Sequence, residues 1–172
     1  MDYQNLTNLD YVEFYGLTEP DTNSLRMYFA RCKASDKPKN LFIGDKIIKD
    51  TKQITVDMDL PILQLEFKSY IAYSITNESF TSWDDNEMFE GKAFRIYSKS
   101  KYLDFIKNHT FAHEVSKDTY PPLTHYGIVC LNHIIDIAST SIPEIIEIGK
   151  PDVKTKKSSK IKNILKSIII KP

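Results

Sequence analysis

LQLEFKSYIAYSITNESF, residues 63–80, is the stretch that decides the fold class of this chain. Its apolar parity holds Leu63, Leu65, Phe67, Ile71, Tyr73 and Ile75, and its polar parity holds Gln64, Glu66, Lys68, Ser74 and Thr76. Successive side chains of a strand point to opposite faces, so this pattern predicts a long, half-buried strand. Because strands usually run for about 5–6 residues, we expect a bend or bulge near Lys68–Ser69.

Several other segments carry the same strand signature. Residues 9–17 and 24–31 flank the turn-forming sequence TEPDTN and predict a hairpin. The remaining predicted strands are 41–43 and 46–48 around Gly44–Asp45, 53–59, 92–97 and 145–148. Their apolar parity makes residues 54–58 and 25–29 the expected neighbours of the long strand in an antiparallel sheet.

Two further segments raise the question of helix against strand. Apolar residues after Ser98 adopt helical spacing, which predicts a short helix at 100–108 with Ser98 or Ser100 as its N-cap. In HYGIVCLNHIIDIAS, residues 125–139, the apolar positions also suit a helix. The many β-branched residues and the polar break after Leu131 favour two strands instead, 125–131 and 133–139.

These elements predict a mainly β (α+β) fold, an antiparallel sheet or sandwich of about eight strands with one short helix near 100–108. We expect one globular domain over residues 1–150. Residues 151–172 are predicted to form a basic linker and a C-terminal amphipathic helix.

The charge is distributed unevenly along the chain. Residues 151–172 carry seven lysines and one aspartate, a net +6, so the other 150 residues of this neutral chain sum to −6. Within the tail, lysines surround apolar residues at helical spacing: Lys160, Ile161, Lys162, Ile164, Leu165, Lys166, Ile168 and Ile169. Three interpretations remain open: the tail docks on the acidic body, lies on an anionic membrane surface, or inserts into a partner's groove.

Several function classes lack support in the sequence. No run approaches the roughly 20 apolar residues of a membrane-spanning helix, and the N-terminus does not resemble a signal peptide. Cys32 and Cys130 lack metal-ligand spacing, which favours reduced thiols in a cytoplasmic protein. Phosphate-binding glycine motifs are absent from the sequence, and an acidic body would repel nucleic acid. We therefore expect no cofactor, no metal and no nucleic-acid partner.

The histidines give two candidate sites. His109 and His113 would share a face if one helix held both, but the helix is expected to end near Asn108, so ordinary surface histidines are favoured over a metal site. His125, His133 and Asp136 could meet across a hairpin as a polar cluster. A structural hydrogen-bond network is favoured there over a catalytic dyad.

Acidic side chains and a lone tryptophan follow the long strand. The candidate partner-binding residues are Asn77, Glu78, Trp83, Asp84, Asp85 and Glu87. A cluster of carboxylates with an aromatic anchor suits a basic protein partner, although most acidic loops are simply solvated.

Three strings carry a resemblance to a known group of proteins: YIAYSITNESF, IYSKSKYLDFI, and HYGIVCLNHIIDIAS followed by a proline. Together they resemble small bacterial proteins of unassigned function, some of them immunity partners of secreted toxins. The resemblance covers residues 63–148 and implies no catalytic residue.

The leading hypothesis is a non-enzymatic interaction protein of immunity or antitoxin type that binds a basic partner near Glu78–Glu87. One alternative is a small hydrolase-like or metal-dependent enzyme that uses His125, His133 and Asp136. The other is a membrane-peripheral protein held by its basic tail.

Overall fold

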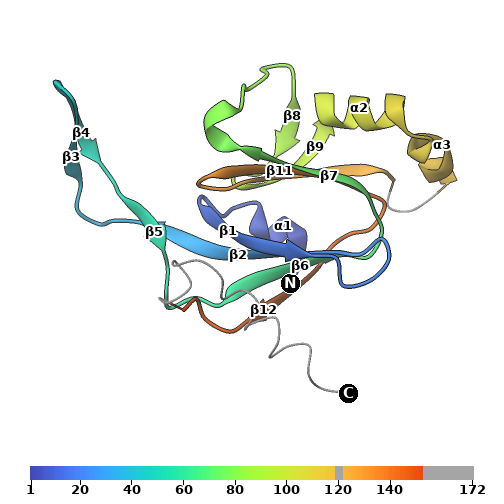
Figure 1. The fold of residues 1–172 in the computed structure, drawn as a ribbon, viewed down its shortest axis with the longest axis horizontal. Coiled ribbons are helices and arrows are strands. Elements are labelled where there is room, and N and C mark those ends of the chain that lie inside the picture. The colour runs from blue at the N-terminus through green and yellow to red at the C-terminus, as the bar shows by residue number, and fades with distance from the viewer. Residues whose placement is uncertain (119–121, 153–172) are drawn as a thin grey trace.

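Two antiparallel sheets that face each other form the body of the protein, as the computed structural model shows for residues 1–118 and 122–152 (Figure 1). The first sheet has the order β1-β2-β6-β12, with β5 also paired to β2, and the second has the order β7-β11-β10-β9-β8. The first sheet comprises β1 (Val12–Thr18), β2 (Leu25–Ala34), β5 (Ile54–Val56), β6 (Ile62–Phe67) and β12 (Glu144–Ile148). The second comprises β7 (Tyr70–Asn77), β8 (Met88–Glu90), β9 (Phe94–Lys99), β10 (Thr124–Val129) and β11 (His133–Ser139).

The mainly β class is confirmed, but the predicted count of about eight strands is too low. With the hairpin of β3 (Lys39–Ile43) and β4 (Lys46–Thr51), the described residues hold twelve strands. Two of the twelve strands were not predicted as separate elements: residues 63–80 contain two strands where one was expected, and β8 lies in a segment that reads as an acidic loop. The two-strand interpretation of residues 125–139 is confirmed, because β10 and β11 pair in antiparallel register.

The decisive stretch passes from one sheet to the other at Lys68–Ser69. Before that step β6 pairs with β2 and β12, and after it β7 pairs with β11. The expected bend is therefore a complete break between strands. A register shift opposite Ala138–Ser139 accompanies the start of β7 and leaves Ile71 without a pairing partner in β11.

A second crossing between the sheets lies beside the first. The chain leaves β11 in the second sheet and enters β12 in the first through Thr140–Pro143. The Ser139 hydroxyl donates to the Ser69 carbonyl at 2.8 Å, and the Thr140 amide donates to the same oxygen at 3.3 Å. The two crossings thereby hold each other, and Lys68 forms an ion pair with Glu144 next to them.

One of the two expected neighbours of the long strand is wrong. β6 does pair with residues 25–29 of β2, with Leu25 opposite Phe67. β5, however, pairs with the far end of β2, at Cys32–Ala34, and not with β6. Strand parity identifies faces and does not identify partners, so the sequence pattern could not exclude this pairing.

The main core fills the space between the two sheets. Its largest fully buried side chains come from both layers and from helix α1 (Tyr3–Leu6): Tyr3, Leu6, Leu25, Met27, Phe29, Leu63, Leu65, Phe67, Phe94, Ile128, Ile135 and Ile137. The Tyr3 ring contacts Phe94 and Tyr126 edge-on, so α1 closes one end of the sandwich. Alternation along each strand leaves the outer face of the second sheet for other contacts.

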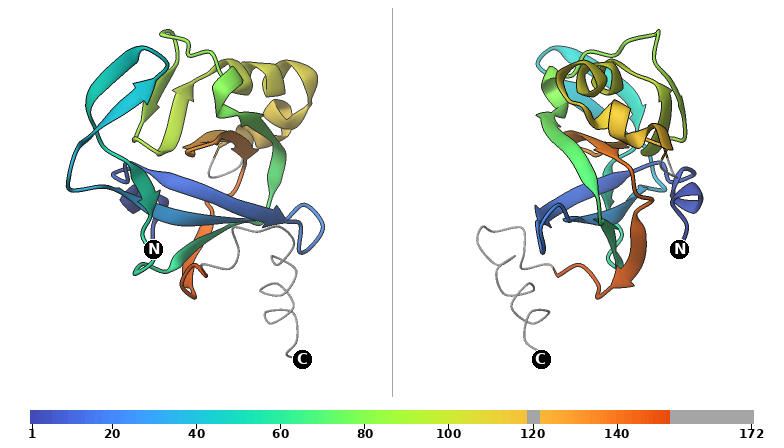
Figure 2. Two further views of the ribbon diagram at one scale, coloured as in Figure 1. Left: turned by 60° about the vertical axis from the view of Figure 1, so that its left-hand side comes forward. Right: turned by 90° about the vertical axis from the view of Figure 1, so that its right-hand side faces the viewer.

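Helix α2 (Lys101–His109) covers part of that outer face, as the two further views show (Figure 2). The predicted helix is confirmed, with Ser100 as its N-cap. Leu103 and Ile106 pack with Leu123 and Ala138 in a second, smaller core. Helix α3 (Ala112–Val115) and the 3₁₀ turn Ser116–Asp118 follow.

The β3–β4 hairpin projects from the body as an arm (Figures 1 and 2). Its strands pair with each other, with Leu41 opposite Ile48 and Phe42 opposite Ile47. Every residue from Lys39 to Asp50 is exposed. The amphipathic tail predicted over residues 151–172 lies outside the described residues, apart from Pro151 and Asp152. Among the described helices, none has the length and apolar character needed to cross a membrane.

Candidate functional site

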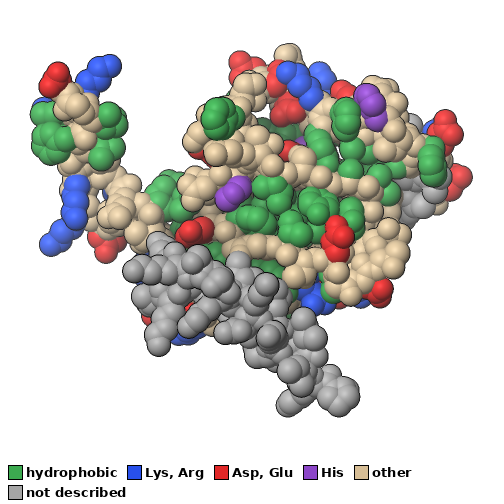
Figure 3. All heavy atoms as spheres, in the orientation of Figure 1, with side chains coloured by type: hydrophobic (Ala, Val, Ile, Leu, Met, Phe, Trp, Pro, Cys, Tyr) green, Lys and Arg blue, Asp and Glu red, His purple; other side chains and the backbone are tan. Residues whose placement is uncertain are grey.

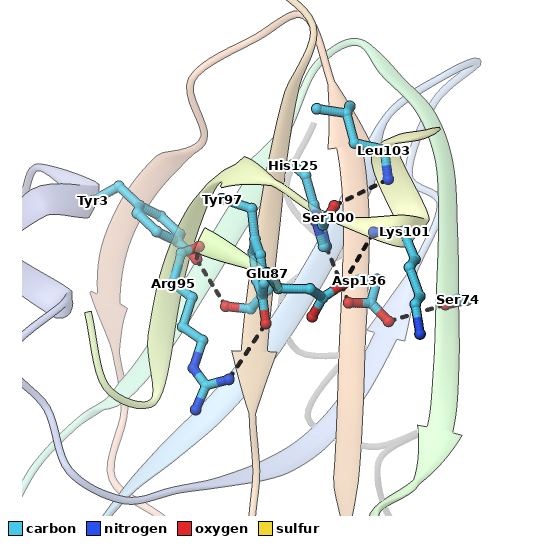
Figure 4. A network of polar contacts seen from close by, with 11 residues as sticks. Tyr3, Ser74, Glu87, Arg95, Tyr97, Ser100, Lys101, Leu103, His125 and Asp136 are labelled. Atoms are coloured by element: carbon cyan, nitrogen blue, oxygen red, sulfur yellow. Dashed lines mark hydrogen bonds and ion pairs between the residues drawn. The ribbon is translucent and has the colours of Figure 1, made fainter. Parts of the chain in front are cut away.

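The outer face of the second sheet brings a set of polar side chains together. Antiparallel register places Asp136 beside Ser74 on one side and Gly127 on the other. His125 occupies the next position of the same face on β10, opposite Tyr97 of β9. The N-terminus of α2 lies over this corner of the sheet and adds Ser100 (Figure 4).

Ser100, His125 and Asp136 form one continuous chain of hydrogen bonds. We call these three residues and Ser74 the network. The Ser100 Oγ lies 2.7 Å from Nδ1 of His125, and Nε2 of that ring lies 3.0 Å from an Asp136 oxygen (Figure 4). A neutral imidazole has one N–H, and a carboxylate can only accept. In the neutral form of the ring, Nε2 carries the hydrogen and the Ser100 hydroxyl donates to Nδ1. Ser74 donates to the other Asp136 oxygen at 3.3 Å.

Two tyrosine rings enclose the histidine. Tyr97 stacks on His125 with 4.2 Å between ring centroids, and Tyr102 approaches from α2 at 5.0 Å. Burial is the largest cause that raises the pKa of each tyrosine, and for Tyr102 the nearby Asp136 carboxylate raises it further. Gly127 permits the close stack, because a Cβ at this position would lie 2.5 Å from the Tyr97 ring.

The network has the order of groups found in a serine hydrolase triad, but its nucleophile position is closed. Ser100 and His125 are 2% and 1% exposed. The Ser100 Oγ also accepts the Leu103 amide at 3.0 Å, as an N-cap does. A substrate carbonyl would have to reach that oxygen through α2 and the tyrosine rings. The arrangement therefore fastens the start of α2 to the sheet, and its donors and acceptors satisfy one another.

The structure brings two of the three predicted cluster residues together and separates the third. His125 and Asp136 meet on the outer face. His133 has the same parity as Ile135 and Ile137, so it lies on the opposite face, where its ring contacts Phe14. Ser100, Tyr97 and Tyr102, which complete the site, come from elements whose position over β10 no local pattern reveals.

His109 takes part in no metal site among the described residues. His109 lies in the last turn of α2, where its ring stacks on Phe105 and its Nδ1 lies 2.9 Å from the Phe105 carbonyl oxygen. Across the part of the chain that the structure describes, three or more His, Cys, Asp or Glu residues nowhere gather in a way that would hold a metal ion.

The second candidate region is residues 78–90, which we call the acidic–aromatic loop. It connects β7 to the end of β8 and passes beside the N-terminus of α2. Three of the predicted binding residues, Asn77 at the end of β7 and Asp84 and Glu87 in the loop, are used by the fold. Asn77 caps the 3₁₀ turn Glu78–Phe80 by accepting the Ser79 amide at 3.0 Å. Glu87 accepts the Lys101 amide at 3.0 Å (Figure 4).

Asp84 is the strongest of these internal attachments. It pairs with the Lys101 ammonium at 2.6 Å and accepts the Asn86 amide at 2.9 Å. The Lys101 hydrogen bond, followed by those from Asn86, lowers the pKa of Asp84 to about 2. Asp84 and Glu87 thus anchor the loop to the first residue of α2.

The rest of the loop faces solvent. Phe80, Met88, Trp83 and Phe89 are exposed by 84%, 60%, 55% and 41%. The Arg95 guanidinium lies over both Phe89 and Trp83, at 4.0 and 4.9 Å from the ring centroids, and so orders the two rings. Glu78, Asp85 and Glu90 are exposed, and among the described residues they have no side-chain hydrogen bond or ion pair.

The sequence pointed to Trp83 and the carboxylates but missed Phe80, Met88 and Phe89. Their exposure is a tertiary property, since aromatic residues next to a strand are more often core residues. Comparison with known proteins adds nothing to this picture: no protein-family model, no curated protein and no solved structure matches the chain.

Proposed function

We propose that the protein is a non-enzymatic interaction module that binds a basic protein through the acidic–aromatic loop. One observation carries the proposal: four large apolar side chains stand exposed beside three carboxylates that have no partner among the described residues. The polar groups of the network, by contrast, are buried or half-buried and satisfy one another, so the solvent-facing chemistry lies in the loop.

The apolar part of the loop supplies the binding energy in this proposal. Exposed aromatic rings and methionine are the residues enriched at the centres of protein interfaces. Arg95 already holds the Trp83 and Phe89 rings in place. Binding of a partner would therefore cost little of the side-chain entropy of these two residues. Anchoring through Asp84 and Glu87 keeps the loop backbone in place for the same contact.

The charge of the loop selects a basic partner. Residues 78–90 contain five acidic residues and no lysine or arginine, a net −5. This charge is most of the −6 that residues 1–150 carry in total, so the negative field is concentrated at the loop and would accelerate encounter with a positive surface. A secreted toxin with a basic surface is the partner class that the resemblance to immunity proteins implies.

The test is affinity capture from the native cell with wild-type bait and a loop bait that carries Glu78→Lys, Asp85→Lys and Glu90→Lys. We expect the wild type to enrich a basic protein that the loop bait loses. The purified partner should then bind more weakly as salt rises, because exposed charges are screened.

A matched bait with Asp59→Lys, Glu114→Lys and Asp118→Lys changes the net charge equally at exposed sites outside the loop. It should capture the partner as well as the wild type does. Equal capture by the loop bait and the matched bait would remove the loop from the function.

A further inference from the structure

The arm formed by β3 and β4 carries apolar side chains on both of its faces. Leu41, Ile43 and Ile48 lie on one face, and Phe42 and Ile47 lie on the other, as the pairing register requires. Their exposed fractions run from 47% for Ile48 to 68% for Phe42. Figure 3 shows green side chains on both sides of the arm, well separated from the body.

An isolated two-stranded hairpin is only marginally stable in water, so this arm needs another surface to cover it. Solvated apolar groups of this size in a projecting element are typical of a docking element. Lysines are interspersed with them: residues 37–52 hold five lysines and two aspartates, a net +3.

A lipid bilayer is a poor fit for this arm. The hairpin tip is Gly44–Asp45–Lys46, so insertion would drive a carboxylate into the hydrocarbon ahead of the apolar residues. Both strands of the arm also have open backbone edges, which are not tolerated in lipid. The arm therefore suits a protein surface with apolar contacts and acidic groups.

That surface is present on the same chain. The acidic–aromatic loop offers four exposed apolar side chains and a net charge of −5, complementary to the arm in both respects. Figures 1 and 2 place the arm and the β7–β8 loop at the same end of the molecule. A two-fold axis needs this arrangement, since each copy must present both patches toward the other.

We propose that the arm of one copy docks on the acidic–aromatic loop of a second copy, reciprocally, in a two-fold dimer. The inference rests on the proposed function in one respect, because it also takes the loop as the binding surface for a basic, apolar partner. In the dimer that partner is the arm of the second copy. The dimer and the heterologous partner then compete for the loop.

The available area supports a reciprocal contact. Only one face of the arm can lie on a loop, so a single contact buries less than the roughly 1,200–2,000 Å² of a stable interface. A two-fold axis makes the contact twice and doubles the buried area. A single arm in a single site would not hold a stable dimer on this count.

The experiment is sedimentation velocity of the full chain over roughly a hundredfold concentration range at low and high salt. We expect a species of twice 19.9 kDa that dissociates as the protein is diluted or salt is raised. Phe42→Ser with Ile47→Ser, in the arm, should weaken association at least tenfold, and so should Phe80→Ser with Trp83→Ser, in the loop. Phe111→Ser with Ile142→Ser removes equally exposed apolar groups elsewhere and should leave the dimer intact.

Mixing the arm variant with the loop variant tests which surfaces meet. In the mixed dimer, the intact arm of one chain faces the intact loop of the other, so the mixture should associate more tightly than either variant alone. Association through two arms would not be restored in this way. A wild type that is monomeric throughout, or an arm variant that dimerises as tightly as the wild type, would overturn the inference, and so would Phe42-dependent flotation with anionic vesicles.

The two proposals fail separately. The arm variant keeps the loop, so it should still capture the basic partner even as a monomer. A monomeric wild type whose loop variant loses that partner removes the dimer and leaves the proposed function standing. A dimer whose loop captures no basic partner does the reverse.

Discussion

The network and the acidic–aromatic loop are neighbours at the N-terminus of α2, and both are rich in polar side chains, yet they use them in opposite ways. In the network each donor meets an acceptor: Ser100 with His125, His125 with Asp136, and Ser74 with Asp136. In the loop Glu78, Asp85 and Glu90 face water without side-chain partners among the described residues.

The difference shows which polar residues belong to the fold. Buried polar groups are costly when unpaired, so the network must be complete, whereas exposed carboxylates are satisfied by water. Lys101 joins the two regions. It directly follows Ser100 of the network, its ammonium pairs with Asp84 of the loop, and its amide donates to Glu87 of the loop. Substitutions in the network should therefore lower the free energy of unfolding more than substitutions of the exposed loop carboxylates do.

The largest loss is expected for His125→Ala. This change removes a fully buried ring from between Tyr97 and Tyr102 and leaves Ser100 and Asp136 without their partner. We expect a loss of about 3 kcal/mol in the free energy of unfolding, measured by urea denaturation. Asp136→Asn is the control: it keeps an oxygen that accepts the Nε2 hydrogen, so its cost should be clearly smaller. A loss below about 1 kcal/mol for His125→Ala would show that the network does not hold α2.

Gly127→Ala should have the next largest effect. Its new Cβ would lie 2.5 Å from the Tyr97 ring, which must move away from His125. Overpacking of this kind costs about 2 kcal/mol and should also change the near-ultraviolet circular dichroism of the tyrosines. At Gly149 a Cβ would meet nothing within 4 Å, so Gly149→Ala is the matched substitution and should leave both measurements unchanged.

Ser100→Ala should cost about 1–2 kcal/mol, because it removes the N-cap of α2 and the hydroxyl that donates to His125. Ser98→Ala provides the comparison. Ser98 is exposed and donates only to the Met88 carbonyl, so urea midpoints should separate the two serines by most of that amount. Equal midpoints would mean that the cap contributes no more than a surface hydroxyl.

These residues also show how far the sequence could lead. Alternation of polarity located most strands, and the helical spacing after Ser98 was sufficient for α2, although it left Ser98 and Ser100 open as the N-cap. The sequence could not predict which strands pair. Residues 54–58 and 25–29 both alternate in polarity, but this pattern does not show that β5 pairs with the far end of β2. Asp136 and His133 differ in parity, yet only the register of the β10–β11 turn decides which of them faces His125.

Exposure was the other property that local patterns could not supply. Residues 41–48 are as apolar as a core hairpin, and no local signal distinguishes an arm in solvent from a buried strand pair. Gly127 is the one overlooked clue at the network, since a glycine within an apolar strand indicates close approach by another group. That group is Tyr97.

A smaller, pH-dependent effect is expected at the junction. The pKa of Asp84 is lowered to about 2 by Lys101 and Asn86. A carboxylate whose pKa is lower in the folded state stabilises that state fully above its unfolded pKa of about 3.9, and the contribution is lost as pH falls through about 2. The urea midpoints of wild type and Asp84→Asn should therefore differ above about pH 4 and converge near pH 2.

Trp83 is the only tryptophan of the chain and adjoins Asp84, so its fluorescence reports the same titration locally. The folded wild type should show a spectral change centred near pH 2 that Asp84→Asn lacks. A constant difference in urea midpoint over this range would place the lost stability in the amide substitution itself and not in the ion pair.

The smallest effect on stability is expected from Glu78→Gln, Asp85→Asn and Glu90→Gln together. These carboxylates have no side-chain partners among the described residues, so unfolding should change by less than about 0.5 kcal/mol. We expect a slight gain in stability rather than a loss, because the variant removes three of the five negative charges that repel one another in the loop. Binding of a basic partner should nevertheless fall, since the same charges draw it to the loop. If the triple variant instead lost more than about 1 kcal/mol, its carboxylates would be part of the fold in the way that Asp136 is, and the loop would no longer be distinguished from the network.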